Sequence, residues 1–275
     1  MKKEVLIIAI FMTILPMSGL APDINIKVSD NISGYVEYFS FDNVTYSTPQ
    51  HFLLEWMNSG SVACKVKIRA DILRNNSLVY TGWSQEKLLK PGAYDSFDIY
   101  WIADEDGNYR TILRAYYCFE SEKIKEVNFS AVNMNKTKMS SLENLADISI
   151  TNTKDKIKVN IKKNRNAKEE LPDIIIVPSD YPAGWYFTSG KFKPEKGKIS
   201  GFIPYNTDYW KEEPITLEMI SEDGKYYAKK TILLKKTQNY YLMYTLAGLI
   251  ILAIILNTLV RKPRLRRKRI LHRKT

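Results

Sequence analysis

Histidine and cysteine are scarce in this chain, with two of each among its 275 residues. Metal-dependent hydrolysis needs several nitrogen, sulfur or oxygen ligands at suitable spacing, and a serine or cysteine nucleophile needs a partner base. His272 lies in a basic run at the C-terminus, and His51 lies on the polar face of a predicted strand, beside Glu55. The sequence has no glycine-rich phosphate-binding loop. We therefore predict no catalytic residue, no cofactor and no metal, and a protein that is not an enzyme.

Two other readings of the polar residues stay open. Glycoside hydrolysis needs only a pair of carboxylates, so a membrane-tethered hydrolase is a third-ranked hypothesis, although no pair stands out. Asp104, Asp106 and Asn108 alternate oxygen ligands along a predicted loop, an arrangement that can hold Ca²⁺ weakly. A tight solvated turn is the favoured interpretation of this loop.

Long uncharged apolar runs are confined to the two ends of the chain. Residues 242–260 carry no charge and would span roughly 28 Å as a helix, close to the bilayer's hydrocarbon core of about 30 Å. Two lysines precede the shorter run at residues 5–15, which suits a secretory signal peptide. We therefore predict a transmembrane helix over 240–260 and a signal peptide over 1–21, with an uncleaved N-terminal anchor as the alternative.

The tail, residues 261–275, has nine Lys or Arg and no acidic residue. It supplies +9 of the net charge of +11, and residues 2–4 supply +1, so the region between is nearly neutral. Basic residues beside a span stay on the cytoplasmic side, which predicts a cytoplasmic tail and extracellular N-terminal domains. No nucleic-acid partner is expected. The residues expected to set this topology and to contact the anionic inner leaflet are Arg261, Lys262, Arg264, Arg266, Arg267, Lys268 and Arg269.

Between the two ends, the hydrophobic pattern has a period of two. Residues 51–57, 65–72 and 156–162 each alternate apolar with polar side chains, which predicts strands with one buried face. Residues 174–177 form a continuous apolar run bounded by prolines, typical of a central strand covered on both faces. The sequence has no amphipathic helix of convincing length outside the predicted span. The fold is therefore predicted to be mainly β.

A short internal repeat predicts two similar units. Residues 105–109 (EDGNY) and 222–226 (EDGKY) each place a turn before a strand with an early tyrosine. Glycine supplies a positive φ in such a turn, and the tyrosine can hydrogen-bond back across the corner of a β-sandwich. A chance repeat is the alternative. We predict a distal β-sandwich at 22–130, a polar linker at 131–146 and a membrane-proximal β-sandwich at 147–237.

The first unit also carries a series of turn motifs, Asn58-Ser59-Gly60, Leu89-Lys90-Pro91-Gly92 and Gly107-Asn108-Tyr109. Their order resembles that of the CARDB-type immunoglobulin-like adhesion modules of archaeal and bacterial cell-surface proteins. In the second unit, Pro182-Ala183-Gly184-Trp185 is similar to the P-x-G-W turn of related sandwich modules. The resemblance implies two tandem immunoglobulin-like β-sandwich domains that serve as spacers or binding modules. It implies no catalytic residues.

The two cysteines, Cys64 and Cys118, are expected to form a disulfide because an even pair in an exported chain is usually bonded. Cys64 starts one predicted strand and Cys118 ends another. Their parity conflicts, since Cys118 would point outward if Tyr109 and Leu113 point inward. A β-bulge would reconcile the two. Two free cysteines are the alternative.

Five Asn-x-Ser/Thr sequences mark candidate glycosylation sites, with unmodified surface asparagines as the alternative. All five lie in the distal part of the chain. About five residues, 235–239, separate the last predicted strand from the span, at most about 18 Å when extended. The second unit is therefore expected on the bilayer surface, with the first facing outward. The candidate sites are Asn31, Asn43, Asn75, Asn128 and Asn135.

Aromatic residues in the second unit form a candidate binding face. Trp185, Tyr186, Tyr209 and Trp210 lie near loops rich in proline and glycine. Amphipathic rings at such positions can meet carbohydrate, protein or lipid headgroups. Ordinary core and loop packing is the alternative.

Taken together, these features predict a single-pass protein of the cell membrane with a non-enzymatic adhesion, ligand-binding or envelope-organising ectodomain. Surface-layer, glycan or membrane-protein partners are expected. The alternative function is an accessory subunit of a membrane complex for transport, secretion or a surface appendage.

Overall fold

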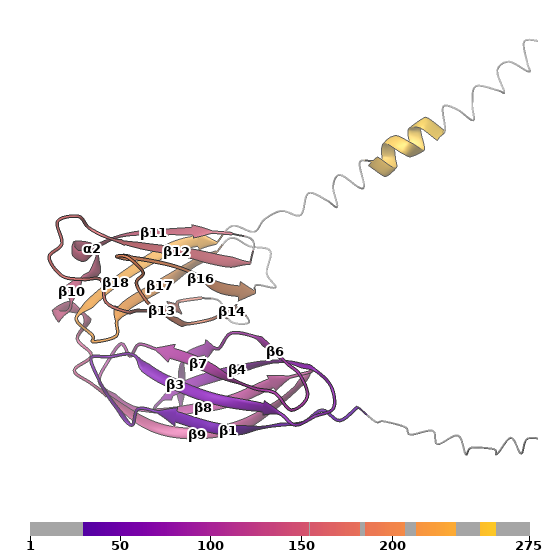
Figure 1. Ribbon diagram of the computed structural model, residues 1–275, viewed down its shortest axis with the longest axis horizontal. Helices are drawn as coiled ribbons and strands as arrows, with labels where there is room; N and C mark the ends of the chain where they lie inside the picture. The colour runs from indigo at the N-terminus through magenta and orange to yellow at the C-terminus, as the bar shows by residue number, and fades with distance from the viewer. Residues whose placement is uncertain (1–29, 154, 182–184, 207–212, 235–247, 257–275) are drawn as a thin grey trace, which may run out of the picture.

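The computed structural model describes residues 30–153, 155–181, 185–206, 213–234 and 248–256. The chain is mainly β, as predicted, and we call residues 34–132 the N-terminal half and residues 140–234 the C-terminal half (Figure 1). Of the predicted span at 240–260, only residues 248–256 are described, and they are helical. Among the described residues, no helix is long and apolar enough to cross a membrane.

Two sheets pack face to face in the N-terminal half. The three-stranded sheet has the order β1-β3-β7, with β1 (Gly34–Phe41), β3 (Gln50–Asn58) and β7 (Tyr94–Trp101). The other sheet has the order β2-β9-β8-β4-β5, with β6 also paired to β4. Its strands are β2 (Val44–Tyr46), β4 (Cys64–Arg74), β5 (Ser77–Trp83), β6 (Lys87–Leu89), β8 (Gly107–Tyr117) and β9 (Glu120–Val132). Strands β2 and β9 run parallel, and the other neighbouring pairs run antiparallel.

Alternating burial explains why these two sheets meet. On β3, Phe52, Leu54 and Trp56 are almost fully buried, while the residues between them are partly exposed. Strand β4 alternates in the same way. Burying one such large apolar side chain contributes about 1.5–3 kcal/mol, so each strand is held with a defined face toward the core. The strands predicted at 51–57 and 65–72 are confirmed.

The C-terminal half also contains two packed sheets. One has the order β10-β18-β17-β13-β15, with β10 (Ser140–Ser141), β13 (Ile174–Ser179), β15 (Gly190–Phe192), β17 (Glu213–Ser221) and β18 (Tyr226–Leu234). The other has the order β11-β12-β16-β14, with β11 (Ala146–Asn152), β12 (Lys156–Lys163), β14 (Tyr186–Phe187) and β16 (Lys198–Asn206). The strand predicted at 156–162 is confirmed as β12, whose three isoleucine and valine residues are fully buried.

The connection between the halves has its own structure. The segment 131–146, interpreted from its polarity as a linker, contains a 3₁₀ turn η1 (Lys136–Lys138), strand β10 and a short helix α2 (Leu142–Leu145). Leu142 and Leu145 are buried in the core of the C-terminal half. The composition concealed this packing because only a few residues of the segment carry it.

The repeated turns place their tyrosines differently. The hydroxyl of Tyr109 donates a hydrogen bond to the carbonyl oxygen of Glu105 at 2.7 Å, which is the predicted bond back across the corner. The hydroxyl of Tyr226 instead donates to the carboxylate of Glu169. Of the two repeated segments, only the first therefore has the predicted bond from its tyrosine. The glycines also differ, with a φ of 153° at Gly107, the first residue of β8, and 71° at Gly224, before β18.

A disulfide joins Cys64 and Cys118, as predicted, with their Cα atoms 5.0 Å apart. The expected bulge is not what brings them together, because the register between β4 and β8 is continuous over the whole pairing. Cys118 instead follows the last residue of β8 and has a left-handed backbone, with a φ of 48°. A left-handed residue breaks the alternation of a strand, so the Cys118 side chain turns back toward β4.

Removing the disulfide is expected to destabilise the protein. The bond closes a separation of 54 residues, for which the chain-entropy model gives roughly 4 kcal/mol. Urea unfolding of the full-length chain in detergent should show a correspondingly lower midpoint for the double variant Cys64→Ser/Cys118→Ser. Reductant should lower the midpoint of the unaltered protein and leave that of the double variant unchanged. Equal midpoints for the two proteins without reductant would contradict this expectation.

Candidate functional site

The two halves meet across an apolar contact carried by strand β13. Ile174 and Ile176 belong to the core of the C-terminal half, whereas Ile175 and Val177 belong to the core of the N-terminal half. Ile220 of β17 also joins the N-terminal core. The continuous apolar run was predicted to be a strand covered on both faces, and this is confirmed. The core of the C-terminal half covers one face of β13, and the core of the N-terminal half covers the other.

Hydrogen bonds also cross this junction. The hydroxyl of Tyr186 donates to the carbonyl oxygen of Ser84 at 2.5 Å, and the backbone N–H of Tyr100 donates to Oγ of Ser189 at 2.7 Å. The hydroxyl of Tyr181 likewise donates to a backbone carbonyl of β5. Burial raises the pKa of both tyrosine hydroxyls. They therefore remain protonated donors across the physiological range.

Two of the four aromatic residues predicted as a binding face are used in internal packing. The side chain of Trp185 lies in the core of the C-terminal half and is 3 % exposed. The ring of Tyr186 packs against the ring of Trp83 in the N-terminal half, with 5.3 Å between their centroids. These two residues therefore follow the alternative to a binding face, which was ordinary core and loop packing. Tyr209 and Trp210 lie outside the described residues.

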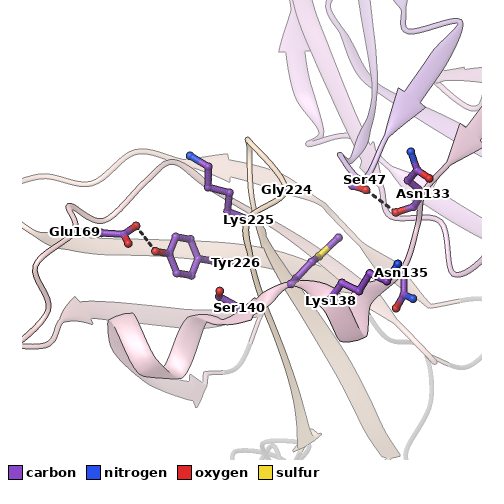
Figure 2. Close-up of a pocket in the computed structure, with 10 residues that line it drawn as sticks. Ser47, Asn133, Asn135, Lys138, Ser140, Glu169, Gly224, Lys225 and Tyr226 are labelled. Carbon is purple, nitrogen blue, oxygen red and sulfur yellow. Dashed lines mark hydrogen bonds between the residues drawn. The ribbon is translucent and has the colours of Figure 1, made fainter.

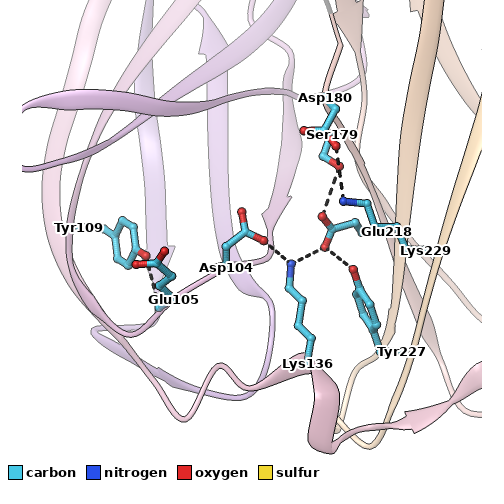
Figure 3. Close-up of polar contacts among 9 residues, drawn as sticks. All are labelled: Asp104, Glu105, Tyr109, Lys136, Ser179, Asp180, Glu218, Tyr227 and Lys229. Atoms are coloured by element: carbon cyan, nitrogen blue, oxygen red, sulfur yellow. Dashed lines mark hydrogen bonds and ion pairs between the residues drawn. The ribbon is translucent and has the colours of Figure 1, made fainter.

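A largely buried ion pair lies in the junction (Figure 3). The ammonium nitrogen of Lys136 is 2.6 Å from a carboxylate oxygen of Glu218 and 2.6 Å from one of Asp104. Ser179 and Tyr227 also donate hydrogen bonds to Glu218. The side chains of Lys136 and Glu218 are 16 % and 7 % exposed, whereas that of Asp104 is 82 % exposed. Water therefore screens the contact with Asp104 far more than the contact with Glu218.

Burial and charge act in opposite directions on the pKa of Lys136. Burial lowers this pKa, but Glu218 and Asp104 together raise it more, so it lies above the ordinary value of 10.5. The stabilisation from this pairing is therefore complete below pH 10.5 and is lost as the pH rises through the higher pKa of the folded state. Burial, followed by the charge of Glu218, raises the pKa of the Tyr227 hydroxyl.

The Lys136–Glu218 pair was not predicted from the sequence, because Lys136 lies in the segment interpreted as a linker. Glu218 carried a signal in the sequence, since this carboxylate lies among the apolar residues Leu217, Met219 and Ile220 of β17. A buried carboxylate within an apolar strand requires a partner. The sequence does not say that the partner comes from residues 136–138, because nothing in that segment has a periodic pattern.

A cleft of about 560 Å³ opens beside η1, where the two halves come together (Figure 2). Ser47 lines it from the N-terminal half, and its hydroxyl donates to the carbonyl oxygen of Asn133 at 2.5 Å. Lys138, Lys225 and the amide of Asn135 add donors to the lining. The cleft is therefore suited to a small hydrophilic group. Among the described residues, no group of three or more His, Cys, Asp or Glu is placed to hold a metal ion.

The three oxygen-bearing residues considered for Ca²⁺ have separate protein partners. Asp104 pairs with Lys136, Asp106 accepts a backbone N–H, and Asn108 accepts a serine hydroxyl. Each oxygen is thus engaged on its own. This describes a hydrogen-bonded turn, the favoured interpretation of this loop.

His51 contacts Asp98 rather than Glu55. Its Nε2 lies 2.8 Å from a carboxylate oxygen of Asp98, and its ring stacks on that of Tyr100 with 4.4 Å between centroids. In the part of the chain that the structure describes, no hydroxyl or thiol is hydrogen-bonded to this ring. The absence of catalysis stays a prediction.

The candidate glycosylation sites are all at the surface. Asn135 lies at the cleft, where its side-chain oxygen accepts a hydrogen bond from the hydroxyl of Thr137 at 2.6 Å. Exposure makes every site accessible to a modifying enzyme, and glycosylation itself stays a prediction. The other four exposed sites are Asn31, Asn43, Asn75 and Asn128.

Exposed aromatic rings gather on the outer face of the β1-β3-β7 sheet. Tyr35, Met57 and Tyr94 lie in one row across the three strands, and Tyr38 lies in the next row. The three tyrosines are 46–66 % exposed, and the Tyr35 hydroxyl donates to the sulfur of Met57 at 2.9 Å. We call these four residues the aromatic row. The aromatic row was not predicted from the sequence, because its residues are neighbours only across strands.

No family model and no curated protein matches this chain. Solved structures give weak likenesses. One is the CARDB domain of a Pyrococcus furiosus protein in complex with di-metal ions, with 16 % identity, a TM-score of 0.28, and coverage of 38 % of this chain and 96 % of that chain. Another is red sea bream transglutaminase, with 10 % identity, a TM-score of 0.26, and coverage of 73 % of this chain and 31 % of that chain.

A third likeness is to β-glucosidase from Listeria innocua in complex with glucose, with 11 % identity and a TM-score of 0.29, over 38 % of this chain and 16 % of that chain. At these scores the likenesses carry no argument about this chain. The fold description therefore rests on the sheets and their packing.

Breaking the buried pair of Lys136 with Glu218 should lower the free energy of unfolding far more than breaking the exposed pair of Lys136 with Asp104. Glu218→Gln leaves the Lys136 cation without its buried partner, at an expected cost of about 3–5 kcal/mol. Asp104→Asn is the matched control and should cost less than about 1 kcal/mol. Urea unfolding at neutral pH measures both. Similar losses in the two variants would contradict a special role for the buried pair.

The close approach of the halves at Gly224 gives a second test. Gly224 and Gly92 have φ of 71° and 75°, so alanine meets the same left-handed strain of about 1–2 kcal/mol at either position. A Cβ atom at Gly224 would lie 2.2 Å from the carbonyl oxygen of Ser47, whereas one at Gly92 has no atom within 4 Å. The unfolding midpoint should therefore fall clearly more for Gly224→Ala than for Gly92→Ala. An equal fall would show that the junction tolerates the added atom.

Proposed function

We propose that this chain is a single-pass cell-surface protein whose two tandem immunoglobulin-like β-sandwich domains, 22–130 and 147–237, form a non-enzymatic binding ectodomain. The observation that carries the proposal is the aromatic row on the outer face of the β1-β3-β7 sheet. Its partner is a surface-layer protein or glycan. The exposed part of the protein thus serves adhesion or organises the cell envelope.

The chemistry of the aromatic row supports a binding role. A tyrosine offers an apolar ring together with a hydroxyl, and such side chains are enriched where proteins meet partners. Glu55 of β3 lies opposite Tyr38, and Ser96 of β7 lies opposite Glu55, so both supply polar groups beside the rings. An exposed sheet face with this composition suits a broad contact with a partner.

The apolar helix at residues 248–256 supports the membrane anchor. Its large apolar side chains from Leu249 to Leu256 are 48–64 % exposed. Exposed apolar surface of this kind needs lipid or another protein to cover it. The described β-structure ends at Leu234, so the anchor follows the C-terminal half and leaves the N-terminal half distal.

The alternative, an accessory subunit of a transport, secretion or appendage complex, is favoured by one residue. Gly248 is the first described residue of this helix, and among the described residues none from elsewhere in the fold lies within 4 Å of the position where its Cβ would be. Small residues allow a second transmembrane helix to approach closely. In this case the ectodomain would hold or regulate a partner that is itself in the membrane.

Purification from the protein's own membranes in mild detergent, followed by mass spectrometry, tests the proposal. Surface-layer or glycan material should accompany the unaltered protein and be lost with Tyr35→Ser/Tyr94→Ser. The matched control is Tyr46→Ser, since Tyr46 is 62 % exposed on β2, outside the aromatic row. A stoichiometric integral-membrane partner retained by all three proteins would instead support the accessory-subunit function. Release of the protein by alkaline carbonate would contradict the membrane anchor.

A further inference from the structure

The outer face of the β11-β12-β16 sheet carries unbalanced positive charge. Lys156, Lys158 and Lys162 of β12 point outward, since they alternate with residues buried in the core. Lys198 of β16 lies directly opposite Lys162. We call these four residues the lysine face. Phe202, 46 % exposed, lies opposite Lys158 on the same side of the sheet.

This arrangement is unfavourable for the isolated fold. Like charges directly opposite each other on neighbouring strands destabilise a sheet, and Lys162 and Lys198 are such a pair. In the described residues, none of the four lysines forms an ion pair with Asp or Glu, although Asp147 lies across from Lys162. Nine lysines elsewhere in the described residues do form ion pairs. The lysine face therefore holds its charge available for a partner of opposite sign.

The exposed ring narrows the chemistry of that partner. The ammonium of Lys156 lies 4.7 Å from the centroid of the Phe202 ring, so a cation and an aromatic ring occupy one patch. Lysines attract the phosphates of anionic lipids, and an aromatic ring lies favourably at the boundary between headgroups and acyl chains. A lipid surface uses both groups. An acidic polysaccharide can also stack a sugar on the ring, so the ring alone does not distinguish these two partners.

The position of the anchor indicates which partner lies nearest to the lysine face. Strand β18 ends at Leu234, and only five residues, 235–239, precede the proposed span at 240–260. Those residues reach at most about 18 Å. A short tether gives the nearest surface a high effective concentration, and that surface is the outer leaflet.

From this charge and this tether we infer that the lysine face binds anionic lipid headgroups of the outer leaflet and holds the C-terminal half against the bilayer. The inference rests on the membrane anchor of the proposed function. Each lysine near an anionic surface changes the affinity roughly fivefold. The contact is electrostatic, so it weakens with salt.

The test uses the full-length chain in vesicles of phosphatidylcholine, with or without phosphatidylglycerol. Labelling of lysines by an amine-reactive ester, read by mass spectrometry, should fall about threefold or more at the lysine face in the anionic vesicles. The labelling should recover at about 0.5 M NaCl. Lys90 and Lys125, exposed in the N-terminal half, should be labelled equally in both vesicles.

Variants separate the lysine face from general charge. In Lys158→Glu/Lys162→Glu/Lys198→Glu, the labelling of Lys156 should become the same in both kinds of vesicle. In the control Lys90→Gln/Lys125→Gln, Lys156 should keep its protection by anionic lipid.

Two results would overturn the inference. The first is equal labelling of the lysine face in the two kinds of vesicle, in protein that alkaline carbonate leaves in the membrane. The second is protection by soluble polygalacturonate but not by anionic lipid, which would assign this face to an acidic polysaccharide. Loss of the protein on carbonate treatment would contradict the anchor itself, so the two failures are distinguishable.

Discussion

The two apolar faces of strand β13 are the constraint on which the rest of the structure depends. Ile174 and Ile176 fill one core, and Ile175 and Val177 fill the other. Separating the halves would expose the second pair to water, at a cost of about 1.5–3 kcal/mol for each side chain. The hydrogen bonds and the Lys136–Glu218 pair then select one orientation from those that apolar burial alone would allow.

This constraint gives the two outer faces a fixed relation to each other. The aromatic row lies on the N-terminal half, and the lysine face lies on the C-terminal half. The exposed side chains of both remain outside the contact between the halves. If the lysine face is held at the membrane, as proposed, a fixed junction lets the aromatic row meet its partner without the entropy cost of ordering a flexible linker. Tyr186 of β14 packs against Trp83 across the junction, whereas Trp185 packs within the core of the C-terminal half.

The sequence predicted what local alternation encodes. The period-two patterns gave strands β3, β4 and β12, and the apolar run at 174–177 gave a strand covered twice. Pairing of Cys64 with Cys118 followed from their number, but the left-handed turn at Cys118 did not, since a backbone conformation at one residue has no periodic signal. The role of Lys136 could not be predicted either, because it depends on Glu218, 82 residues away in the sequence.

Because β13 belongs to both cores, the two halves should unfold together, and scanning calorimetry of the full-length chain measures whether they do. We expect one transition for the described β-structure, with calorimetric and van't Hoff enthalpies that agree. The same single transition, at a lower temperature, is expected for Glu218→Gln. Two separate transitions in the unaltered protein, one for each half, would contradict the claim that β13 joins the two cores.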